Sequence, residues 1–166
     1  MEQDKTCFSC NECGLQNCQK KDSHYPPFCP TTQKTNEEEL ETLNQIYSGE
    51  GIDGQIARNS ARIEAEYYCK KTRVEETILF IQKMGFQKVG IATCVGLLAE
   101  AKTFAKILKN NGIASYMVIC KVGGQDKSVM GLQDSEKVRG GGPETMCNPI
   151  LQAKILNREH TDLNIA

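Results

Sequence analysis

The chain of 166 residues has no tryptophan, only two histidines and no excess of basic residues, with a formal net charge of −1. Without a basic surface it lacks the usual means of holding a phosphate backbone, so nucleic acid is not an expected partner. Its longest apolar stretches, such as residues 89–94, are far shorter than the ~20 residues that span a bilayer. The opening MEQDKTCFSC contains no apolar signal region. We therefore expect a cytoplasmic protein with no membrane partner.

Several catalytic and nucleotide-binding signatures are also missing. No G-x-G-x-x-G follows a strand pattern, and there is neither a P-loop nor a Ser-His-Asp signature. What the sequence does have in excess is cysteine, with nine residues. An odd number cannot pair completely within one chain, and a reducing compartment does not favour disulfides. Clustered cysteines in that setting indicate metal or thiol chemistry.

Composition divides the chain into two regions. Residues 1–36 are rich in Cys, Lys, Asn, Gln and Pro and nearly free of aliphatic side chains. Such a segment buries too little apolar surface to fold alone, so a cross-link such as a bound metal must order it. Residues 37–166 carry the periodic patterns of helices and strands, and we assign them to one α/β domain.

Local signals place the elements of this second region. Asn36 is a predicted N-cap, and Thr72 opens a capping box with Glu75. Helices are predicted after Asn36, over 55–71, from Thr72 to Gly85, over 97–110 and after Asn148-Pro149, with strands over 88–93, 114–120 and 162–166.

Strands that alternate with helices of this length predict a parallel sheet with right-handed crossovers. The expected fold is an open, Rossmann-like parallel sheet flanked by helices, preceded by the small cysteine-rich segment. Because the chain stops as the strand 162–166 begins, we expect the domain to be truncated at this end.

The N-terminal cysteines are spaced Cys7-x2-Cys10-x2-Cys13-x4-Cys18, followed by Cys29-Pro30. Four sulfurs suit a tetrahedral zinc ion or a [4Fe–4S] cluster equally well. The run C-x2-C-x2-C with a distant Cys-Pro is similar to that of bacterial ferredoxins, although the last gap is longer here. This similarity favours a [4Fe–4S] cluster, with zinc as the alternative.

Three further cysteines follow predicted strands or precede a predicted helix. Cys94 and Cys120 lie at the carboxyl ends of two strands, and Cys147 lies just before a helix N-terminus. Ligands of open α/β sheets bind outside the carboxyl ends of the strands, and helix N-termini stabilise thiolates. We therefore interpret these three as redox thiols or ligands of a second site, although each one taken singly is a candidate core residue.

Glycines and one more cysteine extend this hypothesis. Gly96 and Gly124 follow the two strands and allow a ligand to approach the backbone closely. Cys69 belongs to the predicted helix 55–71. It is either a buried packing residue or, with Glu66 or Arg73, a cofactor-binding residue at the sheet edge.

Several motifs in order support a resemblance. The pattern C-x2-C-x4-C-x10-C-P, followed by T-C-V-G-L and M-C-N-P, resembles an uncharacterised family of cysteine-rich, metal-binding bacterial proteins. That family is catalogued as a domain of unknown function and is frequent in anaerobes. The resemblance implies Cys10, Cys13, Cys18 and Cys29 as the N-terminal ligands, with Cys7 as an extra thiol. It implies no reaction.

The leading hypothesis is a cytoplasmic metalloprotein with an N-terminal four-cysteine site and a second, thiol-lined site at the sheet edge. Its expected role is redox chemistry or electron transfer, with an electron-transfer protein or a small molecule as partner. One alternative is a structural zinc knuckle on an α/β module that binds or senses a small ligand. Another is a thiol-dependent oxidoreductase with Cys147 as nucleophile, although no C-x-x-C lies at a strand–helix turn.

Overall fold

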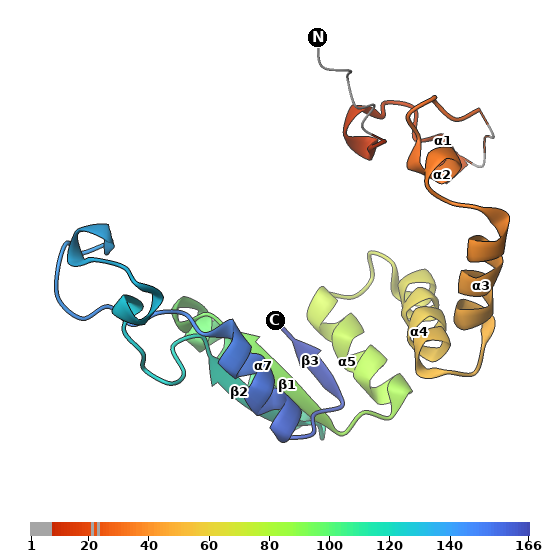
Figure 1. The fold of residues 1–166 in the computed structure, drawn as a ribbon. Helices are drawn as coiled ribbons and strands as arrows, with labels where there is room; N and C mark the ends of the chain where they lie inside the picture. Colours follow the sequence, from red (N-terminus) through yellow and green to blue (C-terminus); the bar gives the residue numbers. More distant parts are fainter. Residues whose placement is uncertain (1–7, 21, 23) are drawn as a thin grey trace, which may run out of the picture. The chain divides into compact units, whose positions relative to one another are not determined.

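The computed structural model describes residues 8–20, 22 and 24–166 (Figure 1). The extra thiol Cys7 lies outside the described residues. The chain divides into two compact units, Met1–Arg58 and Asn59–Ala166. The domain boundary expected at residue 36 stays a prediction.

The first unit contains short helical segments and one longer helix. Helix α3 (Glu37–Ser48) begins at the predicted cap, where the Asn36 side chain accepts a hydrogen bond from the Glu39 N–H at 2.8 Å. The division between the units falls within α4 (Ile52–Tyr67). The remaining elements of this unit are η1 (Cys10–Glu12), α1 (Asn17–Lys20) and α2 (Pro30–Gln33).

The second unit contains the strands. Its elements are α5 (Arg73–Met84), β1 (Lys88–Thr93), η2 (Val95–Leu97), α6 (Leu98–Asn110), β2 (Ala114–Ile119), η3 (Lys127–Met130), η4 (Asp134–Glu136), α7 (Pro149–Arg158) and β3 (Leu163–Ile165). Among the helices that the structure describes, none combines the length and apolarity needed to cross a membrane.

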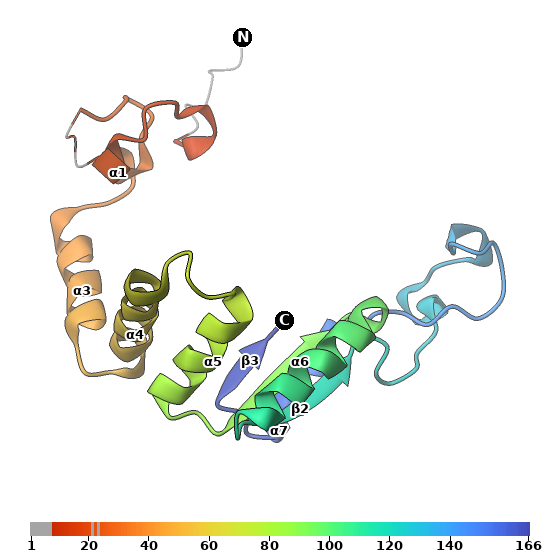
Figure 2. The same ribbon diagram turned by 180° about the vertical axis from the view of Figure 1, so that it is seen from behind.

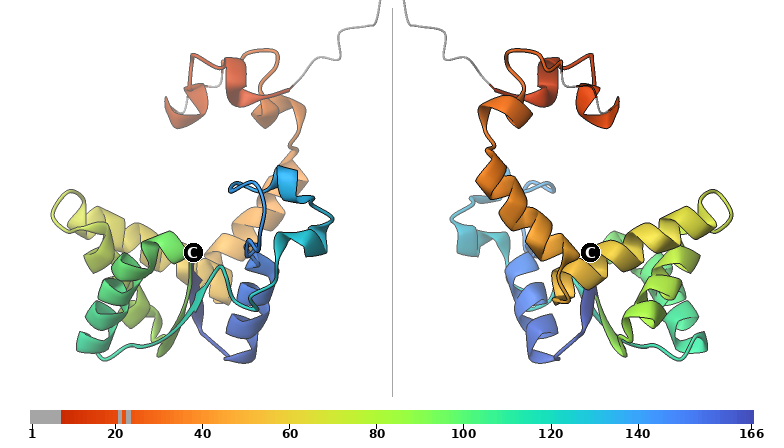
Figure 3. Two further views of the ribbon diagram at one scale, coloured as in Figure 1. Left: turned by 90° about the vertical axis from the view of Figure 1, so that its left-hand side faces the viewer. Right: turned by 90° about the vertical axis from the view of Figure 1, so that its right-hand side faces the viewer.

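The three strands form one all-parallel sheet in the order β2-β1-β3. Helices α5 and α6 pack on one face, and α7 packs against β1 and β2 on the other, as the opposed views show (Figures 2 and 3). This confirms the predicted open parallel sheet flanked by helices. The core on the α5–α6 face consists of Ile78, Ile81, Val89, Ile91, Ala101, Leu108 and Ile113.

Several predicted boundaries are correct and others are wrong. The Thr72 capping box is present, and the left-handed Gly85 (φ 72°) ends α5 as expected. The helix predicted over 55–71 instead ends at Tyr67, so Cys69 lies in the following turn with φ 55° rather than on the helix. The strand predicted over 114–120 ends at Ile119, one residue before Cys120.

A long connection links β2 to α7, and the Asp126 carboxylate holds the two ends of this connection together. Asp126 accepts hydrogen bonds from the Ser128 N–H at 2.9 Å and the Glu144 N–H at 2.5 Å. The Lys137 ammonium, whose side chain is only 6% exposed, lies 3.0 Å from the same carboxylate. These donors, the Ser128 N–H foremost, hold the pKa of Asp126 well below its ordinary value.

Low pH is expected to weaken the hydrogen bonds and the ion pair of the Asp126 carboxylate. Because the folded-state pKa of Asp126 is depressed, its stabilisation is complete above the unfolded value near 3.8 and is lost as the pH falls through the folded value. The amide NMR signals of Ser128 and Glu144 should therefore hold their positions from pH 6 to pH 4 and shift only below. Asp126→Asn should abolish the transition, whereas Asp134→Asn, at a more exposed carboxylate, should preserve it. A midpoint at or above 3.8 would contradict the assignment.

Candidate functional site

The three cysteines expected at the sheet edge line a single cavity. Cys94, Cys120 and Cys147 face a space of about 440 Å³ beside α7 at the carboxyl end of the strands. They come from the ends of β1 and β2 and from the residue two before α7. The rest of the lining is Ala92, Thr93, Pro149, Gln152, Ala153, Leu156, Asn157, Asn164 and Ala166.

Strand register brings Cys94 and Cys120 together. Thr93 and Ile119 are the last paired residues of β1 and β2, and each cysteine is the next residue of its strand. The hydrogen bonding between the two strands continues to Cys120, because the Cys120 N–H donates to the Thr93 carbonyl at 2.8 Å. Side chains alternate between the faces of a sheet, and both cysteines occupy the α7 face, opposite the α5–α6 core.

Two consecutive backbone N–H groups are directed at these sulfurs. The Val95 N–H donates to Cys120 Sγ, and the Gly96 N–H donates to Cys94 Sγ, each at 3.4 Å. Both donors belong to η2, the helical turn that leads directly into α6. Helix N-termini favour negative charge, and N–H groups directed at sulfur tune thiolate sites that hold metals.

Cys147 is positioned by its neighbours. The Asn148 N–H donates to the Cys120 carbonyl at 2.8 Å, and the Asn148 side chain caps α7 by accepting from the Leu151 N–H at 3.0 Å. The Lys121 ammonium donates to the Thr145 carbonyl at 2.6 Å and to Cys147 Sγ at 3.5 Å. The third thiol of the cavity is therefore next to a cation.

Gln152 is a site residue that the sequence reasoning missed. It is 6% exposed, and its Nε2 donates to the Val118 carbonyl at 2.8 Å and to the Thr93 carbonyl at 3.1 Å. One amide thus connects α7 to the ends of both strands just below Cys94 and Cys120. The sequence shows where Gln152 lies relative to the helix cap. A single glutamine on an amphipathic helix does not, however, indicate a functional role.

Of the other residues predicted to bind a ligand, Gly96 contacts a cysteine of the cavity, whereas Gly124 and Cys69 lie outside the cavity lining. The Gly96 N–H donates to Cys94 Sγ, as described, while Gly124 (φ 60°) lies in the connection that follows β2. Cys69 is exposed and also lies outside the cavity lining. The structure supports neither a buried packing role for Cys69 nor a place at the sheet edge.

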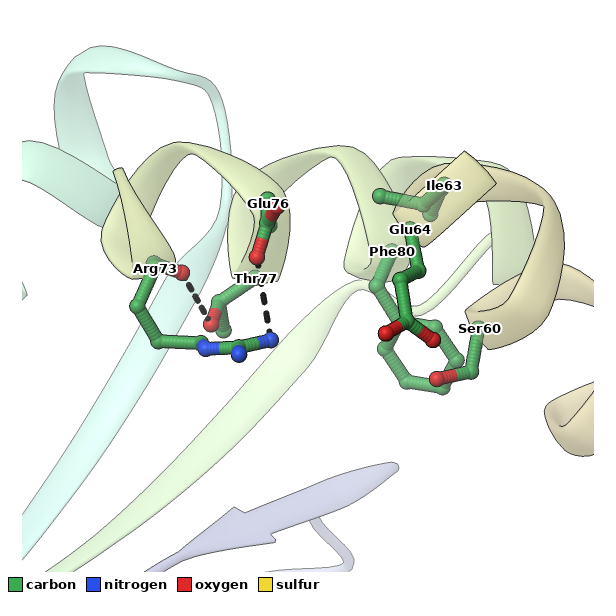
Figure 4. Close-up of a pocket in the computed structure, with 7 residues that line it drawn as sticks. All are labelled: Ser60, Ile63, Glu64, Arg73, Glu76, Thr77 and Phe80. Atoms are coloured by element: carbon green, nitrogen blue, oxygen red, sulfur yellow. Dashed lines mark hydrogen bonds and ion pairs between the residues drawn. The ribbon is translucent and has the colours of Figure 1, made fainter. Parts of the chain in front are cut away.

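A second hollow, of about 300 Å³, lies between α4 and α5 (Figure 4). Within α5, Arg73 pairs with Glu76 at 2.9 Å and the Thr77 hydroxyl donates to the Arg73 carbonyl at 2.7 Å, whereas Glu64 lines the hollow from α4. The Arg73 side chain is thus directed along its own helix and not toward the sheet edge. No sulfur is among the side chains that line this hollow.

The four N-terminal cysteines that the structure describes, Cys10, Cys13, Cys18 and Cys29, lie in separate short elements and share no common centre. The Cys13 N–H donates to the Cys10 carbonyl at 3.0 Å and closes a tight turn between them, Cys18 lies exposed in α1, and Cys29 is buried at the start of α2. A hydrogen bond from the Thr31 hydroxyl lowers the pKa of the Cys29 thiol. Within the described residues, no three His, Cys, Asp or Glu side chains are close enough together to hold a metal ion.

The family described as Protein of unknown function (DUF1847) matches residues 29–166. The chain belongs to this family. An uncharacterized protein of Methanocaldococcus jannaschii is 53% identical over 111 residues, which are 67% of this chain and 55% of that relative. The chain therefore spans about half the length of this curated relative. No solved structure matches the chain.

These matches confirm the resemblance to an uncharacterised family that is catalogued as a domain of unknown function, and they assign no activity. The family match contains all three cysteines of the edge cavity, together with Cys29. Cys10, Cys13 and Cys18 precede it. The edge cavity is therefore the cysteine arrangement that lies wholly within the family's region.

Proposed function

We propose that this chain is a cysteine-ligated metalloprotein whose edge cavity binds a thiophilic group through Cys94, Cys120 and Cys147. The observation that carries the proposal is the convergence of three thiols from three separate segments on one cavity, two of them accepting backbone N–H groups. All eight cysteines among the described residues are free thiols, which agrees with action in a reducing compartment.

The spacing of the donors favours a group larger than one ion. A single tetrahedral zinc ion with Zn–S bonds of ~2.3 Å needs its sulfurs within about 3.8 Å of one another. No three donors of the described residues are grouped in this way, whereas the edge thiols are part of the lining of a cavity of about 440 Å³. An iron–sulfur cluster suits such an arrangement, and it supplies reversible one-electron chemistry when bound.

The chain's own groups have defined tasks in this proposal. The N–H groups of Val95 and Gly96 stabilise negative sulfur, and the Lys121 ammonium offsets charge at Cys147. Ala92, Ala153 and Leu156 supply apolar surface beside the thiols. If three thiolates hold the bound group, room is left for one further ligand. A small molecule or an electron-transfer partner would bind at that position.

A second candidate site is the N-terminal segment. The tight turn that joins Cys10 to Cys13 is the local structure that a C-x2-C ligand pair requires, and Cys29 has a lowered thiol pKa. A metal bound by Cys10, Cys13, Cys18 and Cys29 would supply the cross-link that this segment needs to become ordered. We propose a [4Fe–4S] cluster here, with structural zinc as the alternative.

Metal analysis of the full chain tests both sites. Protein purified without oxygen should show visible cluster absorbance, and iron and sulfide should exceed one cluster per chain. Replacing Cys94 and Cys147 together by serine should remove the edge contribution only. Cys69→Ser, at an exposed cysteine outside the cavity, is the matched control and should leave metal content unchanged.

The alternatives predict different results. A colourless protein that holds one zinc ion per chain would replace the cluster proposal with a structural zinc knuckle on a ligand-binding module. An unchanged metal content in the Cys94→Ser/Cys147→Ser variant would show that the edge thiols are packing residues.

A further inference from the structure

We propose that Cys94 and Cys120 form a cross-strand dithiol that undergoes reversible thiol–disulfide exchange with a low-molecular-weight disulfide. This inference rests on the same edge site as the proposed function and concerns its metal-free state. The two cysteines are 26 residues apart in the sequence. Their pairing is therefore produced by the sheet and not by a C-x-x-C motif.

The register sets the distance between the two cysteines. They occupy equivalent positions one residue beyond the Thr93–Ile119 pair, where the ladder still holds through the Cys120 N–H. Neighbouring strands lie about 4.8 Å apart, which is within the range of about 4.4–6.8 Å between Cα atoms that a disulfide spans. Both side chains line the same cavity, so their sulfurs are on the same side of the sheet.

The hydrogen bonds locate the sulfurs more closely. Cys120 Sγ accepts from the N–H of Val95, the residue that follows Cys94 in the chain, and Cys94 Sγ accepts from the next N–H, that of Gly96. The Sγ atoms of Cys120 and Cys94 therefore both accept hydrogen bonds from the turn that follows β1. A single turn supports both thiols.

The two thiols differ in accessibility in the way that exchange requires. Cys94 is exposed, whereas Cys120 is only 7% exposed. An accessible thiolate reacts first with an external disulfide, and a buried neighbour reacts second because no external reagent reaches it. Cys147 is exposed but hydrogen-bonded to Lys121, in a separate segment outside the two paired strands.

The reaction balances in two exchange steps. The Cys94 thiolate attacks one sulfur of the external disulfide, forms a mixed disulfide and releases one small thiolate. The Cys120 thiolate then attacks Cys94 Sγ and releases the second small thiolate. The two cysteines lose two electrons to the external disulfide, and their two protons end on the two released thiols.

Tryptic peptide mapping tests the pairing without any substitution. Trypsin places Cys94 in peptide 89–102, Cys120 in 110–121 and Cys147 in 140–154, and each peptide has no other cysteine. Metal-free full chain, treated with oxidised glutathione and then alkylated, should yield the 89–102/110–121 cross-link at least about tenfold above any cross-link to 140–154. Reduced glutathione in excess should reverse it.

Variants identify the order of the steps. Cys120→Ser should accumulate glutathione on Cys94, and Cys147→Ser should leave the cross-link intact. Preferential linkage of Cys94 to Cys147, or a Cys120 that stays fully alkylatable while Cys94 is oxidised to completion, would overturn the inference. A chain that forms the cross-link but holds no edge metal would overturn only the proposed function, and a metal-loaded edge site whose metal-free form never cross-links would overturn only the dithiol.

Discussion

Replacing Gln152 by glutamate is expected to lower the free energy of unfolding by roughly 3–5 kcal/mol at pH 7. The substitution is nearly isosteric, but it directs a carboxylate oxygen at the Val118 and Thr93 carbonyls, to which the native amide donates. A buried carboxylate without a donor has a raised pKa. The destabilisation should therefore be greatest well above the unfolded glutamate value of about 4.3 and should diminish as the pH falls toward it.

Urea unfolding of the metal-free chain at pH 7 and pH 5 measures this effect. Gln152→Met is the matched control, since it removes the hydrogen bonds without adding charge. The Thr93 carbonyl keeps its bond from the Cys120 N–H, so we expect a loss of only about 1 kcal/mol with no pH dependence. Equal losses for both variants would show that Gln152 only fills space.

Replacing Leu156 by alanine is expected to cost roughly 2–5 kcal/mol and to open the floor of the edge cavity. Leu156 is 2% exposed and projects from α7 toward the sheet, where its Cδ2 lies 3.1 Å from the position that a Cβ on Gly90 would take. Its removal leaves a void between α7 and β1 that the short helix cannot close without moving Cys147.

Denaturant unfolding and the metal content of the same variant check this expectation together. Ile150→Ala is the control on the same helix, because Ile150 is 70% exposed and its truncation should change stability by no more than ~0.5 kcal/mol. Retention of wild-type stability by Leu156→Ala would contradict the assignment of α7 as the element that covers the cavity.

Local signals predicted the fold well. Asn36, the Thr72 capping box and Asn148-Pro149 act over three or four residues, so the sequence alone identifies them. The end of α4 was missed because helical periodicity continues past Tyr67, and the turn with Cys69 at positive φ has no glycine to mark it.

The candidate site was predictable in its location but not in its pairing. The rule that ligands bind at the carboxyl ends of parallel strands was enough to select Cys94, Cys120 and Cys147. Strand register, which places Cys120 beside Cys94, depends on long-range packing and has no local signal. The same limit applies to Gln152, whose acceptors lie 34 and 59 residues away along the chain.

The proposed function requires the edge thiols to hold a metal group. X-ray absorption can detect such a group in anaerobically purified full chain in which Cys10, Cys13, Cys18 and Cys29 are replaced by serine. We expect a bound metal with a first shell of sulfur at about 2.3 Å, which is lost when Cys94 and Cys147 are also replaced. A chain that retains no metal, or a first shell of only nitrogen and oxygen at about 2.0–2.2 Å, would contradict it.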